Sequence, residues 1–94
     1  MPCDVRLSDG LIDLEDAVRR ITPLTRAVMP VHYAGNPAAI DAVYEFAARH
    51  NLRVIEDAAH AFGSTHKGRK VGSFGDLVCF SFDGIKNITS GEGG

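Results

Sequence analysis

Residues 36–57 read NPAAIDAVYEFAARHNLRVIED, a stretch in which a helical pattern runs directly into a strand pattern. Asn36-Pro37 is a capping residue followed by a proline, which the first helical position tolerates, so we expect a helix from Pro37 to about His50. Four apolar side chains recur on one face of that helix: Ile40, Val43, Phe46 and Ala47. The strand Arg53–Asp57 follows after a short turn. A helix joined to a strand in this way is typical of α/β proteins.

The segment before residue 36 repeats this alternation. Asp13 is an N-cap residue with acidic groups behind it in the first turn, which predicts a helix that ends at Thr22-Pro23. Residues 26–32, RAVMPVH, predict a buried strand in which Pro30 indicates an irregularity or an edge. Strands that alternate with helices favour a parallel sheet with right-handed crossovers, so the predicted fold class is α/β.

The segment after residue 57 contains more loop than regular structure. Residues 58–62 predict a short helix or turn, and residues 66–71 predict a polar turn or a small hairpin about Gly68. Val78–Phe82, VCFSF, is an apolar and aromatic run that predicts a short buried strand, and Ser81 is its one hydroxyl.

Composition excludes several classes of protein. The chain has 94 residues, 45% of them hydrophobic and 23% charged, which is ordinary for one globular domain or a piece of one. A net charge of −2 gives no electrostatic reason to expect a nucleic acid or an anionic membrane as partner. No apolar run approaches the length of a membrane-spanning helix, and residues 1–7 do not form a signal peptide. The default expectation is a cytoplasmic protein.

Neither the cysteines nor the histidines predict a metal site. Cys3 and Cys79 are too few for a metal or disulfide framework, and Cys79 is expected to be a buried, reduced thiol. Glu56 and His60 stand four residues apart, but no third ligand stands at matching spacing. The remaining histidines receive no functional assignment: His32, His50 and His66.

Four polar side chains lie near the ends of the third and fourth expected strands, residues 53–57 and 78–82, where a weak strand candidate at residues 5–7 counts as the first. Asp57 ends the third strand, and His60 lies three residues later, where one helical turn would bring both onto one face. Ser81 lies five residues before Lys86, which follows the fourth strand. Ligands of open parallel sheets bind beyond the carboxyl ends of the strands, so these four groups are candidates for one site.

These residue types match the needs of one cofactor. A lysine amine can form an imine with a carbonyl, and pyridoxal phosphate is the commonest carbonyl cofactor of that kind. Its ring nitrogen needs a carboxylate, its phosphate needs donors and its ring oxygen needs a partner. Plainer interpretations stay open: a solvated Lys86, an Asp57 that only caps a strand, a helix histidine at His60, and a Ser81 on the polar face of a strand.

Three long strings also resemble a known family. They are VMPVHYAGNPAAIDA, VIEDAAHAFGSTHKGRKVGSFGD and CFSFDGIKNITSGEGG, and the similarity runs from about Asp9 to Gly94. They are similar to the core of the nucleotide-sugar aminotransferases, the DegT type of fold-type-I pyridoxal-phosphate enzymes. The resemblance implies that the chain is part of the large, mostly parallel-sheet domain of such a transferase, which has a three-layer αβα arrangement.

The resemblance also implies a role for each candidate residue. By this similarity, Asp57 pairs with the pyridine nitrogen, His60 contacts the ring, Ser81 binds the phosphate and Lys86 forms the Schiff base with pyridoxal phosphate. The implied reaction transfers an amino group from an amino acid, with glutamate the expected donor, to a keto group of a nucleotide-linked sugar. The implied assembly of the full-length protein is a homodimer.

Two alternatives and two departures accompany the resemblance. Related deoxysugar dehydratases carry histidine in place of this lysine, so Lys86 counts against that activity; a non-catalytic regulatory or binding protein is the other alternative. The chain has Asp83-Gly84 where members commonly carry His-Pro or Tyr-Pro. Residues 1–94 also lack the family's upstream Gly-Thr phosphate-cradling segment, the aromatic residue that stacks on the ring and the smaller C-terminal domain. We therefore expect a fragment of the cofactor-binding large domain that is not a competent enzyme alone.

Overall fold

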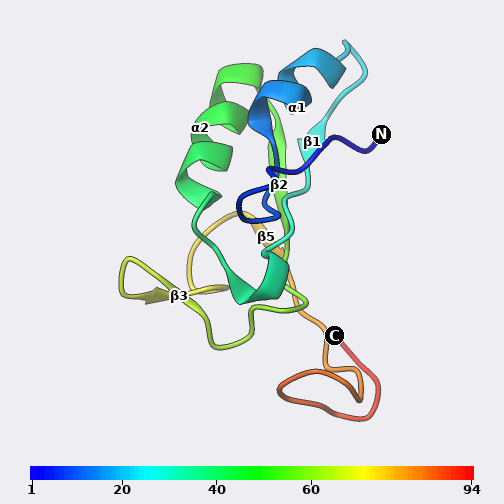
Figure 1. Ribbon diagram of the computed structural model, residues 1–94, viewed down its shortest axis with the longest axis vertical. Coiled ribbons are helices and arrows are strands. Elements are labelled where there is room, and N and C mark those ends of the chain that lie inside the picture. The colour runs from blue at the N-terminus through cyan, green and yellow to red at the C-terminus, as the bar shows by residue number, and fades with distance from the viewer.

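The computed structural model describes all 94 residues. It contains two α-helices, a parallel sheet, a small hairpin and long connecting loops (Figure 1). In chain order the elements are α1 (Leu14–Arg20), β1 (Ala27–Val28), a 3₁₀ turn (Tyr33–Gly35), α2 (Ile40–His50), β2 (Arg53–Asp57), β3 (Thr65–His66), β4 (Arg69–Lys70) and β5 (Leu77–Cys79).

The main sheet has three strands in the order β1-β2-β5, and both pairs are parallel. Ala27 pairs with Arg53, and Asp57 pairs with Cys79. An isolated parallel bridge between Val31 and Asp57 continues the β1–β2 pairing beyond β1 itself. The predicted parallel α/β arrangement is therefore confirmed.

Helix α1 begins as the sequence predicts. The Asp13 side chain accepts hydrogen bonds from the backbone N–H groups of Glu15 and Asp16, which satisfies two of the donors left free in the first turn. Arg19 and Arg20 occupy the last turn, where positive charge suits the helix dipole.

Helix α2 begins three residues later than predicted. The Asn36 side chain does cap a turn, because its Oδ1 accepts from the N–H of Ala38 at 3.0 Å. Regular helix starts only at Ile40, whose N–H donates to the Pro37 carbonyl at 3.1 Å. The helix ends at His50, and its C-cap residue Asn51 adopts a left-handed conformation with φ 53°.

One apolar cluster joins the helices to the sheet. Helix α2 contributes Ile40, Val43, Phe46 and Ala47, the face expected from the sequence. Ala17 of α1 joins the same cluster, as do Val28 and Val54 of the sheet. Both helices lie together at one end of the molecule (Figure 1) and share this one cluster with the sheet. The chain therefore supplies one helical layer and the sheet layer of the expected three-layer arrangement.

The last strand differs from its prediction. β5 covers Leu77–Cys79 rather than Val78–Phe82, and Cys79 is exposed instead of buried. The cause is position: β5 is an edge strand, and Cys79 stands beside Asp57 on the sheet face that neither helix covers.

The loop after β2 contains turns rather than a helix, and the expected hairpin is present. β3 and β4 pair antiparallel about Lys67 and Gly68, which both have positive φ angles, 49° and 77°. Two successive positive φ values match the twist of a two-residue hairpin. Neither α-helix has the length and hydrophobicity needed to cross a bilayer.

Candidate active site

Asp57 is held firmly at the end of β2. Its N–H donates to the Pro30 carbonyl at 2.9 Å, and its carbonyl accepts from the His32 N–H at 3.0 Å. One carboxylate oxygen, Oδ1, accepts from the Ala59 N–H at 3.0 Å. The other carboxylate oxygen makes no hydrogen bond within the chain, so it is free to accept one from a ligand.

His60 lies on a turn beyond Asp57. The expectation that the two share a helix face is wrong, because residues 58–62 form turns. The His60 side chain is exposed, and its ring centre lies 6.2 Å from that of Tyr33 in the 3₁₀ turn. The Ser64 hydroxyl donates to the Gly35 carbonyl at 2.8 Å, which fastens the His60 loop to that turn.

Ser81 follows β5 by two residues and is partly buried. Its hydroxyl oxygen accepts one long hydrogen bond, 3.4 Å, from the Asp83 N–H. Asp57 and Cys79 are register partners at the carboxyl ends of β2 and β5. Ser81 therefore follows the same edge of the sheet that Asp57 ends.

Lys86 lies in a tight turn that starts at Asp83. The Lys86 N–H donates to the Asp83 carbonyl at 2.9 Å, and the Asp83 carboxylate accepts from the Gly84 N–H at 2.7 Å. Asp83-Gly84, noted above as a departure from the pattern of the resemblance, thus forms a turn without a proline. The Lys86 side chain is half-buried, and its amine makes no ion pair or hydrogen bond within the chain.

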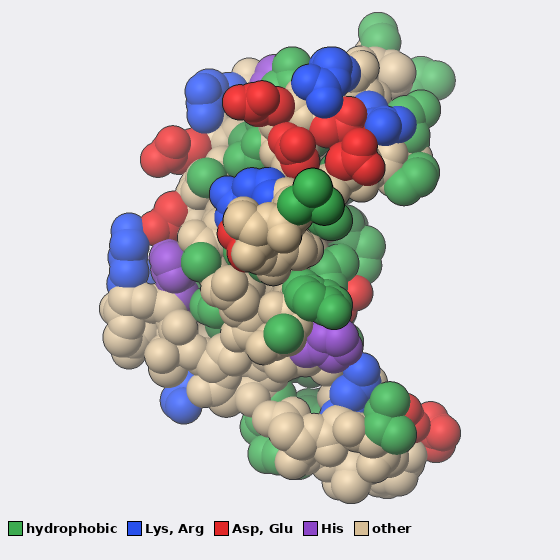
Figure 2. Space-filling model, in the orientation of Figure 1, with side chains coloured by type: hydrophobic (Ala, Val, Ile, Leu, Met, Phe, Trp, Pro, Cys, Tyr) green, Lys and Arg blue, Asp and Glu red, His purple; other side chains and the backbone are tan.

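Three contacts connect the loop of His60 with the segment that carries Lys86. The Phe62 ring meets Phe80 and Phe82 edge to face at 5.5 and 5.3 Å between ring centres. The Asn87 amide donates to the Phe62 carbonyl at 3.0 Å. The molecule is hollowed on one side above the lobe that the C-terminal loop forms (Figure 2). No hydrogen bond joins any two of the four candidate residues.

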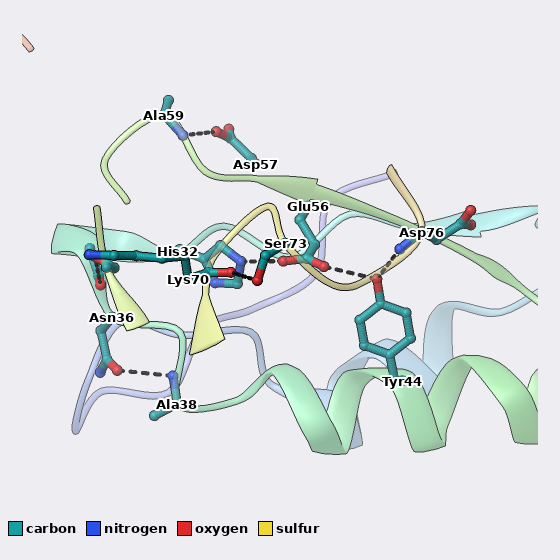
Figure 3. Close-up of polar contacts among 12 residues, drawn as sticks. His32, Asn36, Ala38, Tyr44, Glu56, Asp57, Ala59, Lys70, Ser73 and Asp76 are labelled. Atoms are coloured by element: carbon teal, nitrogen blue, oxygen red, sulfur yellow. Dashed lines mark hydrogen bonds and ion pairs between the residues drawn. The ribbon is translucent and has the colours of Figure 1, made fainter. Parts of the chain in front are cut away.

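A buried polar network lies on the other side of β2 (Figure 3). Nε2 of His32 lies 2.7 Å from Oε2 of Glu56, and the Tyr44 hydroxyl donates to Oε1 of Glu56 at 2.8 Å. The Asp76 N–H donates to the Tyr44 hydroxyl at 2.6 Å. Burial, together with the hydrogen bond to Glu56, raises the pKa of Tyr44 to about 12.

The sequence interpretation missed this network. It assigned His32 no role and considered Glu56 only as a weak metal ligand, whereas no three acidic, histidine or cysteine side chains gather where they could hold a metal ion. The available signal was strand alternation, because Glu56 shares its face with the buried Val54. A carboxylate on a buried face needs partners.

Comparison with known proteins gives the family. A sequence profile of the DegT/DnrJ/EryC1/StrS aminotransferase family matches residues 1–94. The chain belongs to this family. The resemblance seen in the three strings is thereby confirmed.

Individual proteins are also similar to this chain over most of its length. The uncharacterized protein MJ1066 of Methanocaldococcus jannaschii is 51% identical over 83 residues, which are 88% of this chain and 22% of that protein. The crystal structure of 3-amino-5-hydroxybenzoic acid synthase matches 98% of this chain and 24% of its own, with a TM-score of 0.92 and 37% identity. DesI, crystallised in the presence of its TDP-sugar product, matches 95% of this chain and 23% of its own, with a TM-score of 0.87 and 39% identity. The chain thus spans 22–24% of the length of these relatives.

Proposed function

We propose that this chain carries the cofactor-binding centre of a pyridoxal-phosphate-dependent aminotransferase. The observation that carries the proposal is that two groups have no partner within the chain: one carboxylate oxygen of Asp57 at the carboxyl end of β2, and the amine of Lys86 in the turn that follows β5. Membership of an aminotransferase family supports it. In this proposal residues 1–94 form part of the large domain of a cytoplasmic enzyme that works as a homodimer.

The residues present fit the cofactor in chemical type. The free Asp57 oxygen accepts a hydrogen bond from the protonated pyridine nitrogen, and the fixed Asp57 backbone keeps that oxygen in place. Ser81 supplies a hydroxyl to the phosphate, and His60 contacts the ring. When bound, pyridoxal phosphate supplies a ring that accepts the electron pair released from the substrate carbon.

Lys86 has two roles in the proposal. Its amine would hold the cofactor covalently, and the same amine, when free, would move a proton at the substrate carbon. The tight turn from Asp83 to Lys86 fixes the backbone from which the side chain extends.

The proposed amino acceptor is a nucleotide-linked keto sugar, and the proposed donor is glutamate. The TDP-sugar product named for DesI supports a sugar acceptor. The product named for the synthase is 3-amino-5-hydroxybenzoic acid, a different kind of molecule, so the acceptor must be tested directly.

The test uses the full-length protein that contains this chain. We expect it to bind pyridoxal phosphate with a yellow absorbance band, and we expect glutamate to convert that band to the one of the aminated cofactor. Lys86→Ala should abolish the band and lower the amination rate by at least about 10²-fold, since it removes both the covalent anchor and the base.

Lys67→Ala is the matched control. Lys67 is an exposed lysine whose amine lies 2.5 Å from the Asp41 carboxylate, and neither residue is a candidate site residue. It should leave the band unchanged. A full-length protein without the band, or a Lys86→Ala variant that keeps it, would contradict the proposal. Cofactor binding without conversion by glutamate would identify a binding protein instead.

A further inference from the structure

Glu56 is a buried carboxylate for which the proposed function has no use. It is fully buried, and His32 beside it is 3% exposed. Both oxygens of Glu56 are paired, one with His32 Nε2 at 2.7 Å and one with the Tyr44 hydroxyl at 2.8 Å. No buried side-chain nitrogen or oxygen in the chain lacks a partner, so the network is complete.

The network joins every strand of the main sheet. His32 follows β1, Glu56 lies in β2, and Tyr44 comes from α2. The Tyr44 hydroxyl in turn receives the N–H of Asp76, the residue before β5, at 2.6 Å. One carboxylate therefore ties together the ends of three strands and a helix. Displacing any one of them would leave a buried polar group unpaired, which is costly in a low dielectric.

His32 connects the network to Asp57 directly. Its side chain contacts Glu56, while its backbone N–H donates to the carbonyl of Asp57 at 3.0 Å. Two adjacent residues of β2 are thus held by one histidine, the first through the imidazole and the second through the peptide. A shift of His32 would therefore shift the peptide that carries the Asp57 carboxylate.

Gly75 encloses the network from the β5 side. An added Cβ at Gly75 would lie 2.6 Å from the Tyr44 oxygen and would also collide with Glu56 Oε1. The backbone therefore packs against these oxygens, which limits how far Glu56 and Tyr44 can move.

Stability alone does not favour such a network. Apolar residues of similar size often stabilise a buried position as well as a buried ion pair does, and the same face of β2 carries Val54 in the apolar cluster. A buried polar network is expected instead where it holds a neighbouring functional group in one geometry.

We propose that His32, Glu56 and Tyr44 are positioning residues, which hold the Asp57 carboxylate in place for a cationic ring nitrogen. The role rests on the proposed function, because the ring nitrogen belongs to the proposed cofactor. It adds to that function a set of residues that touch neither cofactor nor substrate and act through the backbone of β2.

The experiment compares four variants of the full-length protein. His32→Leu removes the partner of Glu56 at similar size, and His32→Gln returns a side-chain N–H at a comparable reach. Tyr44→Phe removes a single oxygen and is decisive if His32→Leu fails to fold. Arg6→Met is the control: it breaks the exposed Arg6–Asp9 ion pair, 3.2 and 2.5 Å, and neither of these residues belongs to the network.

Three quantities are measured: the unfolding midpoint of the cofactor-free protein, the dissociation constant of pyridoxal phosphate, and the pH at which the yellow band fades. We expect His32→Leu and Tyr44→Phe to weaken cofactor binding roughly ten-fold or more. The yellow band should also fade at a higher pH in these variants. A ring nitrogen held less firmly by Asp57 carries less positive charge, so the protonated group that gives the band loses its proton less readily. His32→Gln should recover most of both effects, and Arg6→Met should change neither.

Variants that lose stability but keep the wild-type dissociation constant and fading pH would overturn the inference, since the network would then be only structural. The proposed function would stand in that case, because the wild-type protein would still bind the cofactor. A wild-type protein that binds no cofactor would overturn both.

Discussion

Two adjacent carboxylates in β2 have opposite environments. Successive side chains of a strand point to opposite faces, so Glu56 faces α2 and Asp57 faces the uncovered side of the sheet. Glu56 has both oxygens paired and no exposure, whereas Asp57 is partly exposed with one oxygen free. Burial of an unpaired carboxylate is strongly unfavourable, which is why Glu56 needs the network and Asp57 does not.

Adding one methyl group at Gly75 tests how tightly the backbone encloses the Glu56 network. Its φ angle is 98°, and an added Cβ would collide with Glu56 and Tyr44. Gly68 has a similar φ of 77° but no atom within 4 Å of an added Cβ. We expect Gly68→Ala to lower the free energy of unfolding by about 1–2 kcal/mol, the cost of the left-handed backbone alone. Gly75→Ala should cost about 1–3 kcal/mol more, because overpacking adds to that cost.

Urea denaturation of the two glycine variants measures the difference. Equal losses for Gly75→Ala and Gly68→Ala would show that the oxygens of Glu56 and Tyr44 move aside freely, contrary to a tightly enclosed network.

Helix α1 is anchored to the N-terminal segment through one side chain. The Asp16 carboxylate contacts Arg20, accepts from Arg19 at 3.1 Å and accepts from the N–H of Asp4 at 2.9 Å. The hydrogen bond from Arg20, followed by that from Asp4, holds the pKa of Asp16 at about 2, below its ordinary value of 3.8. The helix therefore depends on an ionised Asp16.

This dependence predicts an acid-sensitive contribution to stability. Because the folded pKa is depressed, the contribution of Asp16 is complete above pH 3.8 and is lost as the pH falls toward about 2. The difference in unfolding free energy between wild type and Asp16→Asn should therefore shrink between these two pH values. The control is Glu15→Gln, since the exposed Glu15 side chain makes no hydrogen bond. A difference that stays constant with pH for Asp16→Asn would contradict the prediction.

The helices and strands show which structural features could be predicted from neighbouring residues in the sequence. The Asp13 cap and the apolar face of α2 were predicted correctly, because both depend on residues within one or two helical turns. The start of α2 was wrong, because the turn capped by Asn36 comes before the regular helix. The length and burial of β5 were also wrong, since an edge strand is buried only as far as its neighbours cover it.

At the scale of the molecule, one cluster holds the helices to the sheet, and a smaller one lies beneath the loops of the candidate site. The smaller cluster consists of Ala58, Ala61 and Val71, with Val78 and Phe80 packed against it. His60, Ser81 and Lys86 thus stand on loops whose support is separate from the main core, whereas Asp57 ends β2, which contributes Val54 to that core.

Substitutions at Ile40 and Ile88 test whether the main core and the C-terminal loop contribute separately to stability. Ile40 is 1% exposed in the main cluster, whereas Ile88 is 50% exposed in the C-terminal loop. We expect Ile40→Ala to lower the unfolding free energy by about 2–5 kcal/mol. Ile88→Ala should change it by less than about 0.5 kcal/mol. Denaturation of the full-length protein measures both, and a comparable loss from Ile88→Ala would show that the C-terminal loop packs into the core.

The sequence by itself determined the α/β class, the family and the apolar faces, since each depends on short-range spacing or on long matching strings. It also supplied Asp57, His60, Ser81 and Lys86 as candidates, whose roles remain predictions. Only the tertiary structure decided which Asp57 oxygen is free and that Glu56 meets His32 and Tyr44. These contacts join residues up to 24 positions apart, from the segment after β1, from α2 and from β2. Such pairings depend on strand register and helix packing, which no local pattern specifies.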